Sequence, residues 1–450
     1  MKNYNSAYII RISFISALGG YLFGFDFAVI SGALPFLQQQ FGLDAYWEGF
    51  ATGSLALGAI MGCLIAGNIA DKFGRKKSLL VAAALFFISS LCMAFSANKG
   101  IFITSRFLAG IGVGMASMLS PMYIAEIAPA ALRGRMVAIN QLTIVIGILI
   151  TNIVNYSLRN IGDDAWRWMF GLGTIPSGLF FIGALTLPES PRWLVNVARK
   201  DEALKILRKI GDNVFAETTL SSIQSTSKSE TKQGYSAVFK KGVLPVVLIG
   251  MGLAVFQQFC GINVVFNYTP RIFESIGVSQ DNQLLQTVFI GIVNLIFTIL
   301  AMLLVDKLGR KPLMLIGSAG LFFLYLIVVQ MLEADSTAVS WFLLSSIGVY
   351  AMSLAPVTWV LISEIFPNKV RGLAMSVATT ALWLACFAVV YIFPVLVDYF
   401  GHRTYMNFLV FAVICFVYFL FLLRYVPETK NKTLEEIEEK LLFPEGRNRK

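Results

Sequence analysis

The hexapeptide Asp71-Lys-Phe-Gly-Arg-Lys76 returns 235 residues later as Asp306-Lys-Leu-Gly-Arg-Lys311. Each copy is charged and lies between two long apolar runs. Two other motifs also occur twice, in the same order and at nearly the same separation. The first is Glu126-Ile-Ala-Pro followed by Arg133-Gly134, which returns as Glu364-Ile-Phe-Pro followed by Arg371-Gly372. The second is Pro188-Glu189-Ser190, which returns as Pro427-Glu428-Thr429. An internal repeat of this length predicts two copies of one large structural unit.

The sequence between these motifs is apolar enough to lie in a membrane. The 450 residues are 57% hydrophobic and 14% charged, with a mean hydropathy of +0.72, whereas soluble domains carry about 25% charged residues. Twelve apolar stretches are each close to the length of about 20 residues that crosses a bilayer as a helix: residues 8–33, 48–70, 78–97, 101–125, 136–158, 168–187, 243–273, 284–305, 313–332, 340–363, 373–397 and 405–426. We therefore expect an all-α membrane protein whose twelve transmembrane helices form two pseudo-symmetric six-helix bundles.

The repeats and the apolar stretches divide the chain into four parts. We expect an N-terminal six-helix bundle at 1–189, a cytoplasmic linker with short helices at 190–241, a C-terminal six-helix bundle at 242–426 and a cytoplasmic tail at 427–450. Within the linker, residues 201–210 predict an amphipathic helix and the Ser/Thr-rich run 218–229 predicts a flexible link. Residues 434–440 of the tail predict another short helix.

The charged residues give the orientation and exclude several functions. Lysine and arginine gather in alternate loops, which places those loops and both termini on the cytoplasmic side. The net charge of +10 therefore reflects topology, and we expect no nucleic-acid partner. All five cysteines lie in apolar stretches and the single histidine, His402, lies in a loop, so we expect neither disulfides nor a metal site. No phosphate-binding Gly-x-x-x-x-Gly-Lys-Ser/Thr motif occurs, and we expect no cofactor and no enzymatic activity.

A set of short motifs carries a family resemblance over essentially the whole chain. These motifs are Asp71-x-x-Gly-Arg-Lys, Pro121-Met-Tyr-x-x-Glu126, Arg133-Gly134, Pro188-Glu-Ser-Pro-Arg-Trp193, Gln257-Gln258-x-x-Gly-Ile-Asn263 and Pro427-Glu-Thr-Lys430. With them the chain resembles the sugar porter branch of the major facilitator superfamily, and is most similar to bacterial proton-coupled xylose carriers and to hexose carriers. The resemblance implies alternating access by two six-helix domains around a site at the membrane midplane, in a bacterial plasma membrane protein that we expect to be monomeric.

In this family the repeated charged motifs look like latches between helices on the cytoplasmic side. The resemblance places a latch in the first half at Asp71, Arg75, Glu126, Arg133, Glu189 and Arg192, and its counterpart in the second half at Asp306, Arg310, Glu364, Arg371 and Glu428. Such latches would hold the cytoplasmic side closed in the outward-facing state. The alternative is that these charges only set topology, because basic loops are expected on that side in any case.

Two charges lie inside the membrane. Asp26 is in the first apolar stretch and Arg106 in the fourth, both about 8–10 Å below the outer boundary at 1.5 Å per helical residue. A lone charge at the centre of a membrane helix costs about 2.5–3.5 kcal/mol, so we expect the two side chains to face each other. Protonation of Asp26 would then uncouple the pair, which makes it a candidate proton-coupling site. The alternative is a permanent ion pair that only fixes helix packing.

Amide and aromatic side chains in the apolar stretches are candidates for sugar binding. Amides both donate to and accept from hydroxyl groups, and indole faces pack on sugar C–H surfaces. The candidates are Phe23, Gln141, Gln257, Gln258, Asn263, Asn267, Asn294, Trp359 and Trp383. Amides can also join membrane helices to one another, but the match of Gln257, Gln258 and Asn263 to the family motif favours binding.

The chain is thus expected to import a monosaccharide, a hexose or a pentose, by proton symport. Several positions differ from the xylose carriers of the family, among them Leu382 and Cys386, so the sugar stays undecided. A facilitative uniporter, a polyol or inositol symporter and a sugar sensor that does not transport remain alternatives. A membrane enzyme is disfavoured because, beyond Asp26 and Arg106, no cluster of acid, base or nucleophile lies in the apolar stretches. The expected partners are the sugar, the proton and membrane lipids.

Overall fold

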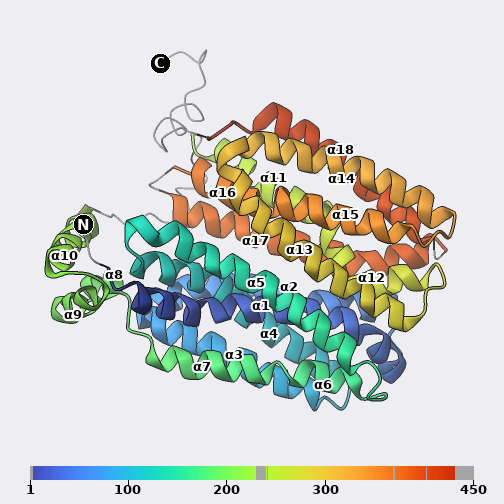
Figure 1. The fold of residues 1–450 in the computed structure, drawn as a ribbon, viewed down its shortest axis with the longest axis horizontal. Helices are drawn as coiled ribbons and strands as arrows, with labels where there is room; N and C mark the ends of the chain where they lie inside the picture. The colour runs from blue at the N-terminus through green and yellow to red at the C-terminus, as the bar shows by residue number, and fades with distance from the viewer. Residues whose placement is uncertain (1–3, 230–239, 241, 368–369, 402, 431–450) are drawn as a thin grey trace. The chain divides into compact units, whose positions relative to one another are not determined.

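A computed structural model describes residues 4–229, 240, 242–367, 370–401 and 403–430. Within them the chain is almost entirely helical (Figure 1). The helices are α1 (Ser6–Phe41), α2 (Ala45–Phe73), α3 (Arg75–Ala94), α4 (Lys99–Ile127), α5 (Ala130–Leu158), α6 (Ala165–Gly171), α7 (Thr174–Thr186), α8 (Pro191–Asn196), α9 (Lys200–Ile210), α10 (Asn213–Ser229), α11 (Leu244–Phe259), α12 (Ile262–Glu274), α13 (Gln280–Leu308), α14 (Arg310–Glu333), α15 (Val339–Met352), α16 (Leu354–Ile365), α17 (Arg371–Tyr399) and α18 (Thr404–Tyr425).

Twelve helical spans in the described residues are long and apolar enough to cross a membrane, which confirms the expected fold class. Three of these spans are built from two consecutive helices: α6 with α7, α11 with α12, and α15 with α16. Each of the twelve apolar stretches of the sequence overlaps one span. The chain is therefore a multi-pass membrane protein.

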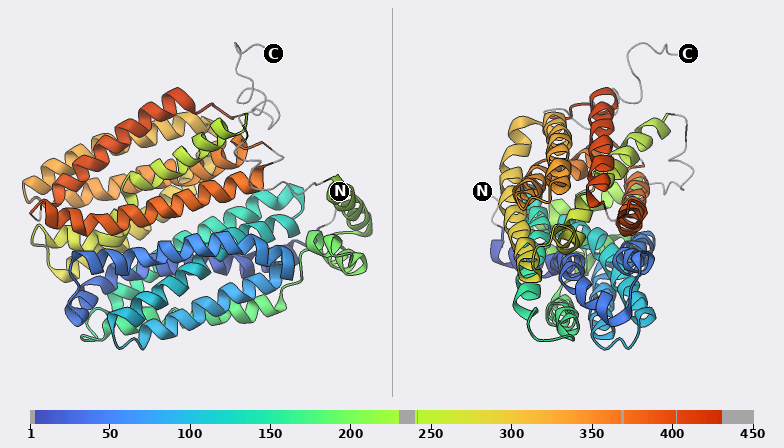
Figure 2. Two further views of the ribbon diagram at one scale, coloured as in Figure 1. Left: turned by 180° about the vertical axis from the view of Figure 1, so that it is seen from behind. Right: turned by 90° about the vertical axis from the view of Figure 1, so that its right-hand side faces the viewer.

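The structure divides into two compact units. The first comprises Met1–Val29, Ser54–Val154 and Asn160–Lys232, and the second Ile30–Gly53, Asn155–Arg159 and Gln233–Lys450. In the first unit α3 packs against α4 and α7 (Figure 2), and in the second α14 runs beside α18 (Figure 1). The four-part division expected from the sequence, with boundaries at 189, 241 and 426, stays a prediction.

The segment after α7 is more helical than the sequence suggested. The expected helix at 201–210 is present as α9, but the expected flexible link at 218–229 is wrong, because this run belongs to α10. Asp212 Oδ1 accepts the N–H of Phe215 at 2.7 Å and so caps the helix, and Thr218 bonds back to the main chain. Leu220 also packs on the small core that α8 and α9 share. The helix expected at 434–440 and His402 lie outside the described residues.

The break between α11 and α12 shapes the second unit near its amide residues. Gly261 has φ = 80°, a left-handed conformation that other residues adopt only with strain. A Cβ atom at this position would lie 2.5 Å from the ring of Phe411. Glycine at 261 therefore allows the chain to turn between α11 and α12.

Candidate functional site

The structure brings Asp26 and Arg106 together in the first unit. Both residues are buried, and Arg106 Nη1 donates a hydrogen bond to the main-chain oxygen of Asp26 at 2.8 Å. The guanidinium carbon of Arg106 lies 5.7 Å from the centre of the Phe170 ring. This hydrogen bond brings the two candidates into contact, and the pairing of their side chains stays a prediction.

The carboxylate of Asp26 has an oxygen with no donor. Oδ1 is buried and has no hydrogen-bond partner among the described residues. A buried charged oxygen without a partner is costly, and the group can relieve that cost by taking up a proton. The role of Asp26 and Arg106 in proton coupling stays a prediction.

Close packing of α1 on α5 fixes the backbone around Asp26. A Cβ atom at Gly24 would lie 2.0 Å from the carbonyl oxygen of Ile144, and one at Gly147 would lie 2.3 Å from that of Tyr21. Two glycines thus let the helix backbones touch in the turns that lead to the aspartate. Phe23 on α1 and Gln141 on α5, the two sugar-binding candidates of this unit, are both only partly buried.

In the second unit the amide side chains form a connected chain of hydrogen bonds. Gln257 Nε2 lies 3.4 Å from the carbonyl oxygens of Leu354 and Ala355, and Gln258 Nε2 donates to Gln257 Oε1 at 3.0 Å. Asn263 Nδ2 donates to Gln258 Oε1 and so joins α12 to α11 across the break at Gly261. These contacts hold the three amides of the Gln-Gln-x-x-Gly-Ile-Asn motif in one orientation.

Two further side chains extend this amide chain. Asn267 Nδ2 donates to the main-chain oxygen of Asn263 at 2.7 Å, and Asn263 Nδ2 lies 3.4 Å from Cys386 Sγ. All of these residues are buried at less than one tenth exposure. The sequence had treated Cys386 only as a departure from the family, and its contact with Asn263 could not be read from spacing along the chain.

The remaining candidates lie on other helices of the second unit. Asn294 on α13 and Trp383 on α17 are buried, whereas Trp359 on α16 is 37% exposed. Hydrogen bonds among the described residues join the amides of α11 and α12 to one another but do not include Asn294. The role of these three residues therefore stays a prediction.

The first repeated motif forms a compact charged cluster. Arg75 donates to both carboxylate oxygens of Glu126 through Nε at 3.0 and 3.3 Å, and Nη1 lies 3.3 Å from Asp71 Oδ1. Glu189 accepts the backbone N–H groups of Arg75 at 2.8 Å and Lys76 at 3.2 Å. Four of the six predicted residues thus meet at the N-terminus of α3, where a carboxylate is favoured by the helix dipole.

The second copy repeats this geometry. Arg310 Nη2 lies 3.2 Å from Glu364 Oε1, and Glu428 accepts the N–H groups of Arg310 at 3.1 Å and Lys311 at 3.0 Å. Thr429 Oγ1 also donates to Glu364 Oε2 at 2.6 Å. Burial alone would raise the pKa of the Glu428 carboxyl, but the surrounding backbone N–H groups, chiefly those of Lys430 and Arg310, lower it below its ordinary value.

The glycine of each copy is needed for this contact, which the sequence analysis did not foresee. Gly74 and Gly309 have φ = 94° and φ = 95°. A Cβ atom would lie 2.2 Å from Glu189 Oε2 at the first position and 2.9 Å from Glu428 Oε2 at the second. The Gly in the repeated Asp-x-x-Gly-Arg-Lys motif is the signal that could have identified both.

The other predicted latch residues make different contacts. Arg133 Nε donates to the carbonyl oxygen of Ala125 at 3.0 Å, and Arg371 donates to that of Phe366 at 3.2 Å. Arg192 is exposed, and the side chain of Asp306 lies outside the described part of the structure. Arg133 and Arg371 therefore cap the carbonyl ends of α4 and α16.

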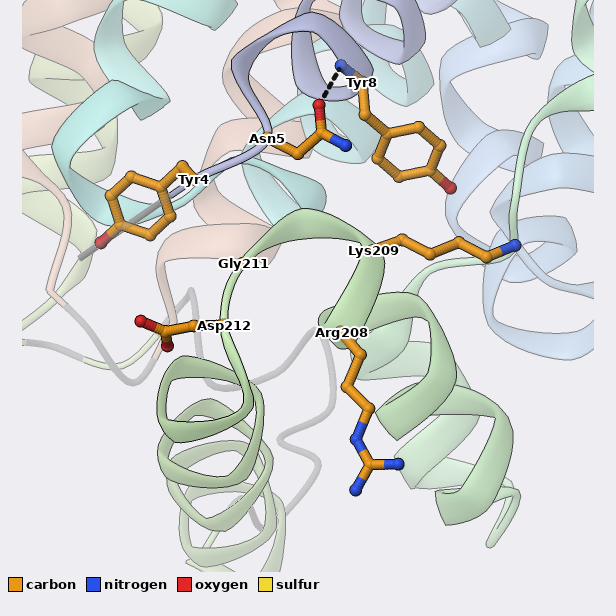
Figure 3. A pocket seen from close by; sticks show the side chains of 7 residues that line it. All are labelled: Tyr4, Asn5, Tyr8, Arg208, Lys209, Gly211 and Asp212. Carbon is orange, nitrogen blue, oxygen red and sulfur yellow. Dashed lines mark hydrogen bonds between the residues drawn. The ribbon is translucent and has the colours of Figure 1, made fainter.

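An open hollow of about 430 Å³ lies where the start of α1 meets the turn between α9 and α10 (Figure 3). Its wall consists of Tyr4, Asn5, Tyr8, Arg208, Lys209, Gly211 and Asp212. Asn5 Oδ1 accepts the N–H of Tyr8 at 3.1 Å, and the N–H of Asn5 donates to the carbonyl oxygen of Ile210 at 2.9 Å. None of the residues predicted for sugar or proton binding lines this hollow, so it is not the candidate site.

Known proteins share this sequence and fold. The family model described as "Sugar (and other) transporter" matches residues 12–441. The arabinose-proton symporter of Bacillus subtilis (strain 168) is 39% identical over 447 residues, covering 97% of this chain and 96% of the relative. The D-xylose-proton symporter of Escherichia coli (strain K12) is 40% identical over 475 residues, covering 97% of this chain and 96% of that protein.

A solved structure extends the likeness to the fold. The partially occluded inward-open form of the xylose transporter XylE from E. coli superposes with a TM-score of 0.85 at 37% identity, covering 95% of this chain and 100% of the other. The match of the family model to nearly the whole chain agrees with the motifs and with the twelve spans. The chain therefore belongs to the sugar transporter family of the major facilitator superfamily.

Proposed function

We propose that this protein imports a monosaccharide together with a proton by alternating access. Relatives that are about 40% identical over nearly the whole chain are named proton symporters for arabinose and for D-xylose. A pentose or a hexose is therefore the cargo class that we assign. Both termini lie in the cytoplasm, as the distribution of lysine and arginine indicates.

The main support for proton coupling is the carboxyl oxygen Oδ1 of Asp26, which accepts no hydrogen bond among the described residues and lies in a residue that contacts Arg106. In the unprotonated form the carboxylate sits near a fixed positive charge, and in the protonated form Oδ1 no longer needs a donor. The protonated and unprotonated forms of Asp26 therefore differ in their interaction with Arg106, and so in how α1 packs against α4. Protonation can therefore favour one conformation of the transporter over another.

The sugar is bound by the amides of α11 and α12 together with residues of α1, α5 and α13. Gln257, Gln258 and Asn263 supply donors and acceptors that already have a fixed orientation, which lowers the entropic cost of binding. Phe23 and Gln141 contribute from the first half, and Asn267, Asn294, Trp359 and Trp383 complete the set. The two clusters around Arg75 and Arg310 are the latches of the cytoplasmic side.

A facilitative uniporter is the second candidate, because the same amide site would serve it equally well. It differs in one respect: Asp26 and Arg106 would then be a purely structural pair. Uptake of labelled arabinose, xylose, glucose and myo-inositol into proteoliposomes, with and without an imposed pH gradient, tests both points. A gradient-driven uptake of one of these sugars supports symport, and uptake that only equalises concentrations supports the uniporter.

A further inference from the structure

A second buried carboxylate lies in the first turn of α2. Glu48 is 1% exposed, and neither the proton site nor the sugar site uses it. It forms an ion pair with Arg271 on α12, whose guanidinium also lies 3.7 Å from Asp398 Oδ1 on α17. Gln38 on α1 donates to Glu48 Oε2 at 2.8 Å. Four polar side chains from four helices thus meet at one point of the second unit.

The backbone around Glu48 is packed tightly against α17. A Cβ atom at Gly49 would lie 2.3 Å from the carbonyl oxygen of Tyr391, and one at Gly53 would lie 3.0 Å from the ring of Phe387. The ring of Phe50 meets the rings of Phe387 and Tyr391 edge-on, with centres 6.5 and 6.4 Å apart. The ion pair therefore belongs to a continuous contact along the first two turns of α2.

This contact joins the two repeats of the sequence. Gln38 and Glu48 belong to the first repeat, whereas Arg271 and Asp398 belong to the second. Glu48 lies in the first turn of α2 and Asp71 lies in its last, at opposite ends of the same helix. The cluster thus occupies the end of α2 away from the Arg75 latch.

Because the side chains of the cluster are polar or charged, they suit a contact that separates and exposes its residues to water. A buried ion pair is weak evidence for stability, because the desolvation of both charges offsets much of their attraction, and apolar side chains would pack as well. If the contact separates, however, both charges regain their hydration, which lowers the free energy of the open form. An apolar contact would instead expose hydrophobic surface to water on opening.

We propose that Gln38, Glu48, Arg271 and Asp398 form a clasp that closes the outer end of the transport path and opens to admit the sugar. The inference rests on the proposed alternating access. Glu48 and Arg271 form the central ion pair. Asp398 is a second acidic neighbour of the Arg271 guanidinium, and Gln38 connects α1 to the cluster through its hydrogen bond to Glu48. The clasp thus acts at the opposite end of α2 from the Arg75 latch.

An exposed ion pair of the same unit provides a matched control. Arg159 at the end of α5 pairs with Asp281 at the start of α13 at 2.6 Å, but the Asp281 side chain is 63% exposed. Exposed pairs are screened by water and contribute little. Asp281→Asn should therefore leave the outer end closed.

The experiment measures the distance between spin labels at Tyr46→Cys and Tyr399→Cys in a background without the native cysteines. Both positions are largely exposed, at 61% and 80%, and neither belongs to the clasp. Glu48→Gln and Arg271→Gln, made separately on α2 and α12, should each raise the ratio of open to closed forms about tenfold or more, because Glu48→Gln removes the buried partner of Arg271 and Arg271→Gln leaves the buried Glu48 without its cation. The double variant should open no further than the more severe single variant.

Unchanged distance distributions in both single variants would overturn the clasp, and so would an equal change in Asp281→Asn. The use of two separate substitutions guards against a variant that fails to fold. The distances are read without sugar and without a pH gradient. A wrong assignment of cargo or of coupling would therefore leave this result intact, which separates failure of the clasp from failure of the proposed function.

Discussion

Glu189 accepts a hydrogen bond from the backbone N–H of Arg75 at 2.8 Å, although 113 residues lie between them. Glu428 and Arg310 repeat this contact in the second half at 3.1 Å. In each half a carboxylate from the segment after the last span caps the helix that follows the Asp-x-x-Gly-Arg-Lys motif. The repeated motifs therefore make the same contact within each half of the chain.

The cap at Glu428 should make stability depend on acidity. The folded pKa of Glu428 lies below its ordinary value of 4.5, so the stabilisation is complete above about pH 4.5 and disappears as the pH falls through the folded pKa. Glu428→Gln should therefore lower the Tm at pH 7, and the difference from the parent should shrink below about pH 4.5. Thermal unfolding in detergent across this range measures it.

A surface variant serves as the control for the cap. Glu217→Gln on the exposed face of α10 should leave the Tm unchanged at every pH. If the difference between parent and Glu428→Gln stayed constant from pH 7 to pH 3.5, Glu428 would not be the group responsible.

The ion pair at Arg75 should contribute far more than an exposed one. Arg75→Ala leaves Glu126, whose side chain is 11% exposed, without its partner, and should lower the free energy of unfolding by about 3–5 kcal/mol. Arg199→Ala removes a pair with Glu202 in which both side chains are about half exposed, and should cost at most about 1 kcal/mol. Equal losses in the two variants, measured by thermal unfolding in detergent, would contradict the buried cluster.

Much of the fold was predictable because membrane helices follow from composition and length. The repeated motifs grouped Arg75, Glu126 and Glu189, which contact one another in the structure, and their role as a latch stays a prediction. The flexible link expected at 218–229 was wrong because Ser and Thr hydroxyl groups can bond back to helix carbonyls, as Thr218 does. Sequence spacing alone does not distinguish a Ser/Thr-rich flexible link from a Ser/Thr-rich helix.

The contacts that the sequence missed depend on distances between segments far apart in the chain. In the sequence Glu48 is one acidic residue at the edge of the second apolar stretch, and Arg271 is one basic residue near the end of the seventh. Their pairing needs α12 to begin at the break after Gly261 and to continue to Arg271 on the side of α2. Likewise, Arg106 reaches the backbone of Asp26, an atom that no sequence pattern singles out.

Removal of one amide should weaken sugar binding. Gln258→Ala loses the hydrogen bonds that join Gln257 to Asn263 and the bonds that we propose it makes to the sugar. The variant should lower affinity about 5- to 150-fold, for a loss of about 1–3 kcal/mol. Isothermal titration with the transported sugar measures the change. Asn407→Ala, a buried amide on α18 outside the motif, is the control that should keep the parental affinity. A Gln258→Ala protein that binds every tested sugar as the parent does would remove this residue from the site.

Neutralising Asp26 should separate exchange from accumulation. Asn at this position resembles the protonated carboxyl in size and charge but cannot release a proton. Asp26→Asn should therefore exchange labelled for unlabelled sugar across the membrane while failing to concentrate it. Exchange in proteoliposomes preloaded with sugar is the measurement, and normal accumulation by Asp26→Asn would show that another group carries the proton.

The most direct test of proton-coupled sugar import is uptake by the parent protein in proteoliposomes with an imposed membrane potential. At 100 mV, inside negative, one proton supplies about 2.3 kcal/mol, which supports about fifty-fold accumulation at 1.36 kcal/mol per tenfold. We predict that labelled sugar accumulates to within this limit and that protons enter the vesicles with it. Uptake that stops at equal concentrations on both sides, with no entry of protons, would contradict the account and identify a uniporter.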